Sequence, residues 1–148
     1  MEKYIMKIEL EDILAMKNIN ASNLALQNHW RITKSGLIER VTTAPNKLYF
    51  LKKEFIGSFV FENSKLCFIN LVPIIENINV PNYPCEEYQN LKKEYNINLL
   101  KKTYGEDYVI KGNKIEWKCS SYAISVETIE NGKNRYTGGN IKIDMRKC

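Results

Sequence analysis

The chain has 148 residues, 44% of them hydrophobic and 26% charged, which excludes a disordered chain and suits one domain over residues 1–148. Its net charge of +5 is spread evenly, with 10 basic and 7 acidic side chains in residues 1–74 and 12 and 10 in residues 75–148, whereas nucleic-acid binders usually concentrate charge in a stripe or tail. The single histidine, His29, excludes a histidine-rich metal site and leaves a catalytic relay with few partners.

The first thirty residues carry mixed strand and helix signals. Apolar residues alternate over positions 4–10, which predicts a short strand. Residues 11–16 favour a helix. Ser22 is a candidate N-cap for a second short helix that carries Leu24 and Leu26.

Residues 30 to 72 have the pattern of strands. They are rich in β-branched and aromatic residues and are divided by turn signals such as Ser35-Gly36. The predicted strands cover residues 30–33, 37–42, 47–51, 54–62 and 66–72. The last two form the clearest hairpin, and the proline-containing segment that follows them is interpreted as a packed connection within the same domain.

Residues 84–104 form the clearest predicted helix. Glu86 and Glu87 lie in its first turn and Lys101 and Lys102 in its last, as the helix dipole prefers, and Gly105 provides a stop. A stripe of apolar and aromatic residues recurs at helical spacing and is predicted to face the core. Its members are Tyr88, Leu91, Tyr95, Leu99 and Tyr104.

The last forty residues predict a meander of strands at 108–110, 115–119, 122–126 and 141–145. Strands followed by one helix and more strands favour an α+β fold, a single domain with a mainly antiparallel sheet. We expect the helix of about residues 84–104 to pack on one face, against Trp117 and Ile124, with short N-terminal helices. The same order also permits a strongly curved sheet or a half-barrel.

The four cysteines, Cys67, Cys85, Cys119 and Cys148, are too far apart for a CxxC clamp, so we expect no metal and no cofactor. Cys67 and Cys119 have apolar neighbours and are predicted to lie in the core, the other two nearer the surface. The N-terminus lacks an apolar signal region, and no segment is long enough to span a bilayer. These features predict a cytoplasmic protein with no membrane partner.

The candidate catalytic groups are better explained structurally. His29 precedes Trp30 and a predicted strand, and no neighbouring carboxylate orients it, so a partly buried packing role is favoured over general-base catalysis. The acidic pairs at 86–87 and 106–107 are adjacent in sequence and do not converge on one atom. The lysine pairs at 52–53, 92–93 and 101–102 alternate with acids, which disfavours nucleic acid as a partner.

The glycine-rich loop over residues 130–139 is the most suggestive surface element. It combines flexible glycines with residue types that are enriched at binding hot spots and lacks the phosphate-loop pattern. The candidate partner-binding residues are Lys133, Arg135 and Tyr136. A solvated hairpin loop is the plainer interpretation of the same residues.

The sequence favours a non-catalytic protein-binding module, an inhibitor or immunity-type protein. This functional prediction is based only on the general properties of the chain. Its small size, its high Ile, Asn and Lys content and its lack of catalytic groups are typical of small bacterial immunity proteins. The positive charge predicts another protein with an acidic surface, such as a toxin or an enzyme, as partner. The alternatives are a small-ligand-binding protein or enzyme with a pocket between sheet and helix, and, third, a nucleic-acid-binding protein.

Overall fold

The computed structural model describes residues 8–16, 18–83, 85–129 and 138–146. In these segments one antiparallel sheet is built from β1 (Arg31–Ser35), β2 (Ile38–Thr42), β3 (Leu48–Phe50), β4 (Lys53–Glu62), β5 (Lys65–Pro73), β6 (Val109–Lys111), β7 (Lys114–Lys118), β8 (Ala123–Glu127) and β9 (Ile141–Asp144). The helices of the same segments are α1 (Leu10–Leu14), α2 (Ala21–Asn28) and α3 (Glu86–Tyr104). The predicted α+β class is confirmed, and so is the hairpin of β4 and β5.

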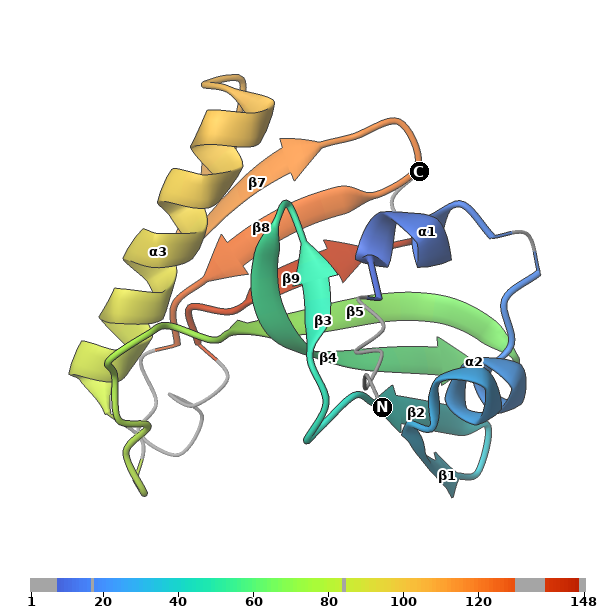
Figure 1. The fold of residues 1–148 in the computed structure, drawn as a ribbon. Coiled ribbons are helices and arrows are strands. Elements are labelled where there is room, and N and C mark those ends of the chain that lie inside the picture. Colours follow the sequence, from blue (N-terminus) through green and yellow to red (C-terminus); the bar gives the residue numbers. More distant parts are fainter. Residues whose placement is uncertain (1–7, 17, 84, 130–137, 147–148) are drawn as a thin grey trace.

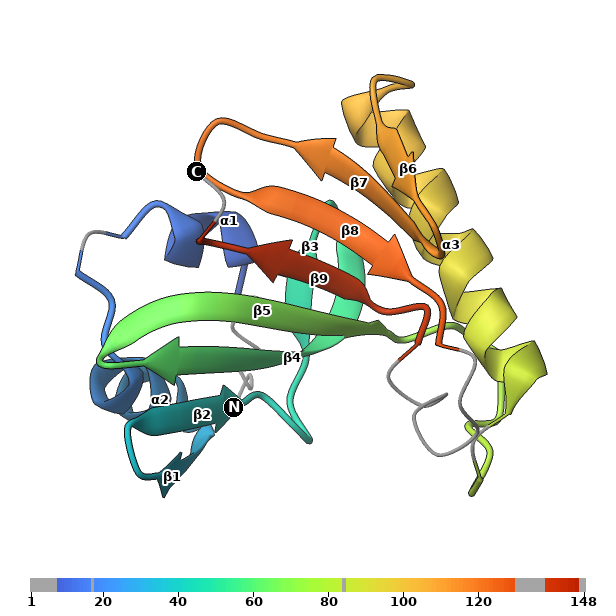
Figure 2. The same cartoon turned by 180° about the vertical axis from the view of Figure 1, so that it is seen from behind.

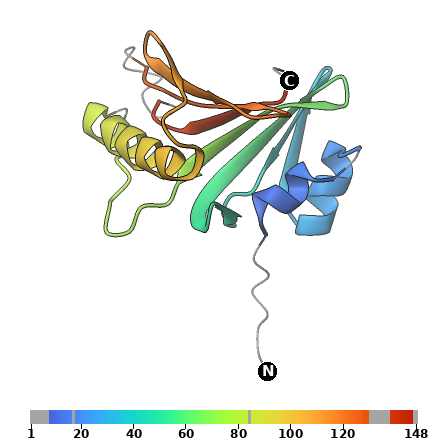
Figure 3. The same ribbon diagram turned by 90° about the horizontal axis from the view of Figure 1, so that it is seen from above.

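The strands lie in the order β1-β2-β4-β5-β9-β8-β7-β6, and β3 pairs with β4 off this path. The C-terminal strand β9 is inserted between β5 and β8, so it joins the two halves of the chain. The sheet is strongly curved, and the helices lie on one side of it (Figures 1 and 3). Its edge strands β1 and β6 do not pair with each other, so the sheet is open and not closed into a barrel.

The helix-covered face of the sheet holds the core. Alternation along each strand places every second side chain on this face, and the antiparallel register aligns them into rows. One such row runs across six strands and is almost fully buried; it consists of Trp117, Ile124, Ile143, Ile69, Phe59 and Val41. Burying each of these side chains stabilises the fold by about 1.5–3 kcal/mol.

The strand predicted over residues 4–10 is wrong at its C-terminal end. Leu10 begins helix α1, where Leu10 and Ile13 are buried three residues apart. Extended pairing is limited, in the described part of this segment, to a parallel bridge between Glu9 and Tyr49, in which the Tyr49 amide donates to the Ile8 carbonyl at 2.8 Å. Burial of two side chains at helical spacing outweighs the local alternation.

The N-cap of helix α2 is Asn20 and not Ser22. The Asn20 side chain accepts a hydrogen bond from the Asn23 amide at 2.8 Å, whereas Ser22 lies inside the first turn. Replacing Asn20 by alanine is expected to cost about 1 kcal/mol of unfolding free energy, because that amide loses its acceptor. Thermal or urea unfolding checks this, with Ser22→Ala as the matched control; equal losses in the two variants would contradict the assignment.

Helix α3 buries Tyr88 of the predicted stripe, but the rest of its buried face differs from the prediction. Its buried residues are Tyr88, Gln89, Lys92, Asn96 and Leu100. The predicted Leu91, Tyr95 and Leu99 are only half-buried. The polar side chains turn inward because α3 packs against the backbone at the two ends of the β8–β9 connection, which needs hydrogen-bond partners.

The end of α3 lies where the sequence predicts it. Gly105 is the C-cap with a φ of 83°, and its amide donates to the Lys101 carbonyl at 2.8 Å. The indole N–H of Trp117 donates to the Gly105 carbonyl at 3.0 Å, which ties the helix end to β7.

Candidate functional site

The predicted partner-binding residues Lys133, Arg135 and Tyr136 lie outside the described residues, but both ends of their loop are placed. The Gln89 side chain donates to the Ile129 carbonyl at 3.1 Å and accepts from the Ile129 amide, as a neighbouring strand would. At the other end, the Asn96 amide group donates to the Gly139 carbonyl at 2.7 Å. The loop therefore leaves β8 and enters β9 from two points held by α3.

The face of the sheet that points away from the helices is uncovered in the segments that the structure describes (Figure 2). We call the part formed by β5, β9, β8 and β7 the open face. Across it the register aligns Glu116, Ser125, Lys142 and Asn70 in one row. A second row consists of Ala123, Asp144 and Phe68. This alternation explains why most outward positions of these strands are polar, with Ala123 and Phe68 as the exceptions in the two rows.

Two of the acids of the open face, Glu116 and Asp144, are covered by cations, whereas a third acid, Glu127, is exposed. Glu116 has a side chain only 3% exposed and pairs with Lys111 and Lys114 at 3.4 and 3.5 Å. Asp144 has a side chain 10% exposed and pairs with Arg146 at 3.4 Å. The Lys111 and Arg146 side chains are about half exposed, at 52% and 53%. The charge that meets solvent here is therefore mainly positive.

Two cations also lie over one aromatic ring. The Lys142 amine is 4.2 Å from the centroid of the Phe68 ring, and the Arg146 guanidinium carbon is 3.9 Å from it. Cation–π contacts of this kind hold long side chains in place at a surface. Lys142 and Arg146 are exposed and Phe68 is half-buried, so the group presents charge and an aromatic ring together.

A depression of about 400 Å³ lies in the open face and reaches the base of the loop, since Ile129 and Asn140 are among its lining residues together with Glu116, Lys142 and Arg146. Asn140 is 4% exposed, and its buried side-chain oxygen has no hydrogen-bond partner among the residues that the structure describes. The two described ends of the predicted loop thus lie at the rim of the open face.

A second hollow of about 750 Å³ lies beside the C-terminal end of α2. We call it the His29 groove; it is lined by Ile8, Gln27, Asn28, His29, Trp30, Pro45, Asn46, Lys47, Tyr49 and Glu54. The Tyr49 hydroxyl donates to Glu54 Oε1 at 3.1 Å, and this hydrogen bond raises the pKa of Tyr49. Lys47 pairs with Glu54 at 3.2 Å.

His29 is exposed, so the predicted packing role is wrong for it, whereas Trp30 is buried and stacks on Phe59 with ring centroids 5.7 Å apart. His29 and Glu54 line the same groove, in which the Glu54 carboxylate contacts Tyr49 and Lys47.

The sequence analysis did not identify the open-face residues as a candidate site, although the alternation along the strands indicates that they point outward. The alternation that places Ile115 and Trp117 in the core also points Glu116 outward. The pairing of β7 with β8 and of β8 with β9, which brings such residues together on neighbouring strands, could not be derived from the sequence. The paired lysines were also poor indicators, because Lys92 is fully buried and lies over the Tyr88 ring at 4.7 Å.

Comparison with protein-family models, curated proteins and solved structures finds no significant match. Within the residues described here, no three His, Cys, Asp or Glu side chains are grouped to hold a metal ion. None of the helices in these segments combines the length and apolar character needed to cross a membrane.

Proposed function

We propose that this chain is a non-catalytic binding module, of the inhibitor or immunity type, that occupies an acidic surface of another protein. The observation that supports this most is the open face, where nearly buried acids lie beneath exposed cations. Such an arrangement attracts an acidic partner while the buried acids hold the cations in fixed positions.

The composition of the open face also suits a protein partner. Aromatic and arginine side chains carry much of the binding energy at protein interfaces, and Phe68 and Arg146 are in contact here. The predicted loop residues Arg135 and Tyr136 belong to the same classes, and the described ends of their loop reach this rim.

Charge reversal on the open face tests the proposal. We expect the double variant Lys142→Glu/Arg146→Glu to lose a partner that the unchanged chain captures from the organism that carries the gene, with an affinity loss of about 100-fold or more. The captured partner should be acidic and should dissociate more readily as salt is raised. Quantitative affinity capture followed by calorimetry with the purified partner measures both effects.

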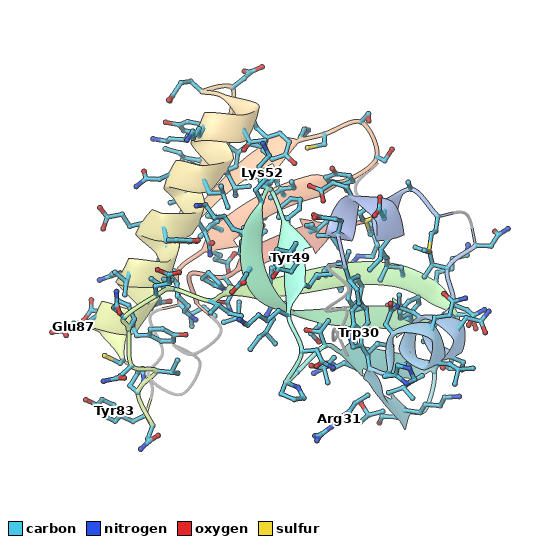
Figure 4. All side chains as sticks on the ribbon, in the orientation of Figure 1. Trp30, Arg31, Tyr49, Lys52, Tyr83 and Glu87 are labelled. Carbon is cyan, nitrogen blue, oxygen red and sulfur yellow. The ribbon has the colours of Figure 1, made fainter. Side chains whose placement is uncertain are left out.

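The matched control is Lys52→Glu/Lys53→Glu, which makes the same charge change at the β3–β4 turn on the helix-covered side (Figure 4). It should bind like the unchanged chain. Equal capture by both double variants would reject the open face as the interface. Capture that disappears after nuclease treatment would instead support the nucleic-acid alternative.

A further inference from the structure

We infer that the edge strand β6 binds an extended acidic segment of the partner protein, which adds to the sheet as a further strand. The identity of this occupant rests on the proposed function, which requires an acidic protein partner. The contact is a separate one, because no residue of β6 lines the depression in the open face. Main-chain hydrogen bonds along a sheet edge give affinity, and hollows that take alternate side chains give specificity.

Strand β6 is the more accessible of the two edges of the sheet. In the described segments it pairs with β7 alone, and hydrogen-bonded pairs alternate along an antiparallel ladder, so every second residue turns its backbone N–H and C=O groups away from β7. Val109 and Ile110 in this strand are 48% and 67% exposed. On the opposite edge strand, β1, every exposed side chain is polar. Because exposed apolar residues on an edge favour pairing with another strand, β6 is the edge suited to a partner.

A hollow lies between β6 and α3, and we call it the β6 groove. It has a volume of about 280 Å³, and its apolar lining residues are Ile97, Tyr108, Ile110 and Ile115. Strand β6 runs alongside α3 (Figure 2). Ile110 pairs with Ile115, which lies in the core, so Ile110 faces the side of the sheet on which α3 packs. A strand added to β6 would therefore direct alternate side chains into this groove.

The charged residues that line the β6 groove are all lysines. Lys114 pairs with Glu116 at 3.5 Å, whereas Lys93 and Lys101 form no ion pair within the described part of the chain. The Lys101 amine lies 5.1 Å from the centroid of the Tyr108 ring, a contact that holds it at the groove. The acids of this part of α3 and of the segment before β6 are exposed and do not line the groove; they are Glu94, Glu106 and Asp107. The groove therefore attracts carboxylates.

The spacing of Lys93 and Lys101 matches an extended segment. They lie eight residues apart on one side of α3, with Ile97 between them, so a rise of about 1.5 Å per residue separates their Cα atoms by about 12 Å. Four residues of a strand span about 13 Å. A segment with acids at positions i and i+4 and an apolar residue at i+2 therefore places one carboxylate near each amine, and the apolar side chain over Ile97 and Ile110.

The test is a titration of the full chain with three synthetic peptides, blocked at both ends and followed in ¹H–¹⁵N spectra. The matching peptide, Thr-Glu-Thr-Ile-Thr-Glu-Thr, carries the acids and the apolar residue at alternate positions. The charge-reversed peptide is Thr-Lys-Thr-Ile-Thr-Lys-Thr. The rearranged peptide, Thr-Thr-Ile-Glu-Glu-Thr-Thr, keeps the composition of the matching one but places its two acids on opposite faces of a strand.

We expect the matching peptide to move the β6 amide signals saturably with a Kd of roughly 1 mM, because a short edge offers few contacts. The two control peptides should bind about tenfold more weakly or not at all, since one or both carboxylates no longer reach a lysine. Hydrogen exchange of β6 amides should slow in the complex, because the added main-chain hydrogen bonds protect them. Signals of α2, which packs at the opposite edge of the sheet, serve as the reference (Figure 2).

Variants of the chain test the two parts of the groove. Lys93→Gln/Lys101→Gln should weaken the matching peptide about tenfold. The matched control, Lys52→Gln/Lys102→Gln, removes the same charge at two exposed positions outside the groove and should leave the titration unchanged. Ile110→Thr keeps a strand-forming residue at an exposed position, so the fold should persist while the peptide binds several-fold more weakly.

Strand addition is overturned if the matching peptide gives no saturable shift in β6, if a control peptide binds equally well, or if β6 amides exchange as fast with the peptide as without it. Shifts of β6 that depend on the concentration of the chain alone would identify a second copy as the occupant and would also overturn it. A failure of the charge-reversal experiment on the open face is a distinct result, because the titration contains only the chain and a peptide and needs no captured partner.

Discussion

Replacing Gly139 by alanine should destabilise the fold by about 3 kcal/mol or more. Gly139 has a φ of 82°, and a Cβ atom there would lie 2.4 Å from the Gln89 carbonyl oxygen and 3.0 Å from the Lys93 amide nitrogen. Both obstructing atoms belong to the backbone of α3, so no side-chain rotation relieves the clash. Moving the helix would break the hydrogen bond from Asn96 to the Gly139 carbonyl.

Gly112→Ala is the matched control for this prediction. Gly112 also has a positive φ, 59°, but a Cβ atom there would meet nothing within 4 Å. The Gly112→Ala variant should therefore lose only about 1 kcal/mol of unfolding free energy, which is the conformational cost of a positive φ without glycine. Urea unfolding followed by circular dichroism measures both variants, and equal losses would show that the contact between Gly139 and α3 is not tight.

Replacing Lys92 by methionine should stabilise the protein at neutral pH, by at most about 2 kcal/mol. Burial lowers the pKa of Lys92 from its ordinary 10.5 to about 8, because the charged amine loses its hydration. A pKa difference of this size corresponds to about 3 kcal/mol. The cation–π contact to Tyr88, worth roughly 1 kcal/mol, and the further interaction of Lys92 are lost in the variant and reduce the gain. Methionine has a similar shape and carries no charge.

The sign of the pH dependence follows from the direction of the shift. Below about pH 8 the amine is protonated in both the folded and the unfolded state, so folding bears the full cost of burying the charge. Between about pH 8 and pH 10.5 the folded state releases its proton first, and the unchanged chain gains stability as the pH rises. The advantage of Lys92→Met should therefore shrink over this range.

Urea unfolding of both chains between about pH 7 and pH 9.5 tests this, with the difference between them as the quantity compared. Ionisation of the tyrosines affects both chains alike and cancels in that difference. Lys102→Met, at an exposed position of the same helix, corrects for the change in helix propensity. A stability difference that stays constant with pH would mean that Lys92 is solvated in the folded protein.

Local patterns were sufficient for most of the secondary structure. Alternation along β4 and β5 predicts both strands and the side of each that faces the core. The charges at the ends of α3 and the glycine at position 105 predict the extent of that helix. Each of these signals involves residues only a few positions apart, so it can be recognised in a single sequence.

The inward face of α3 could not be predicted in this way. Apolar spacing pointed to Leu91 and Leu99, but the polar Gln89 and Asn96 are buried because backbone groups about forty residues away, at Ile129 and Gly139, need partners. No periodicity within the helix encodes that need.

The amino-acid sequence by itself determined the strands, the long helix and the α+β class, because hydrophobic periodicity and turn residues act over short distances. Only the tertiary structure decided that β9 lies between β5 and β8, which gathers Lys142, Arg146 and Phe68 on one open face. It also decided that His29 shares a groove with Glu54. Both arrangements join residues far apart in the chain, and such contacts are selected by the packing of the whole core.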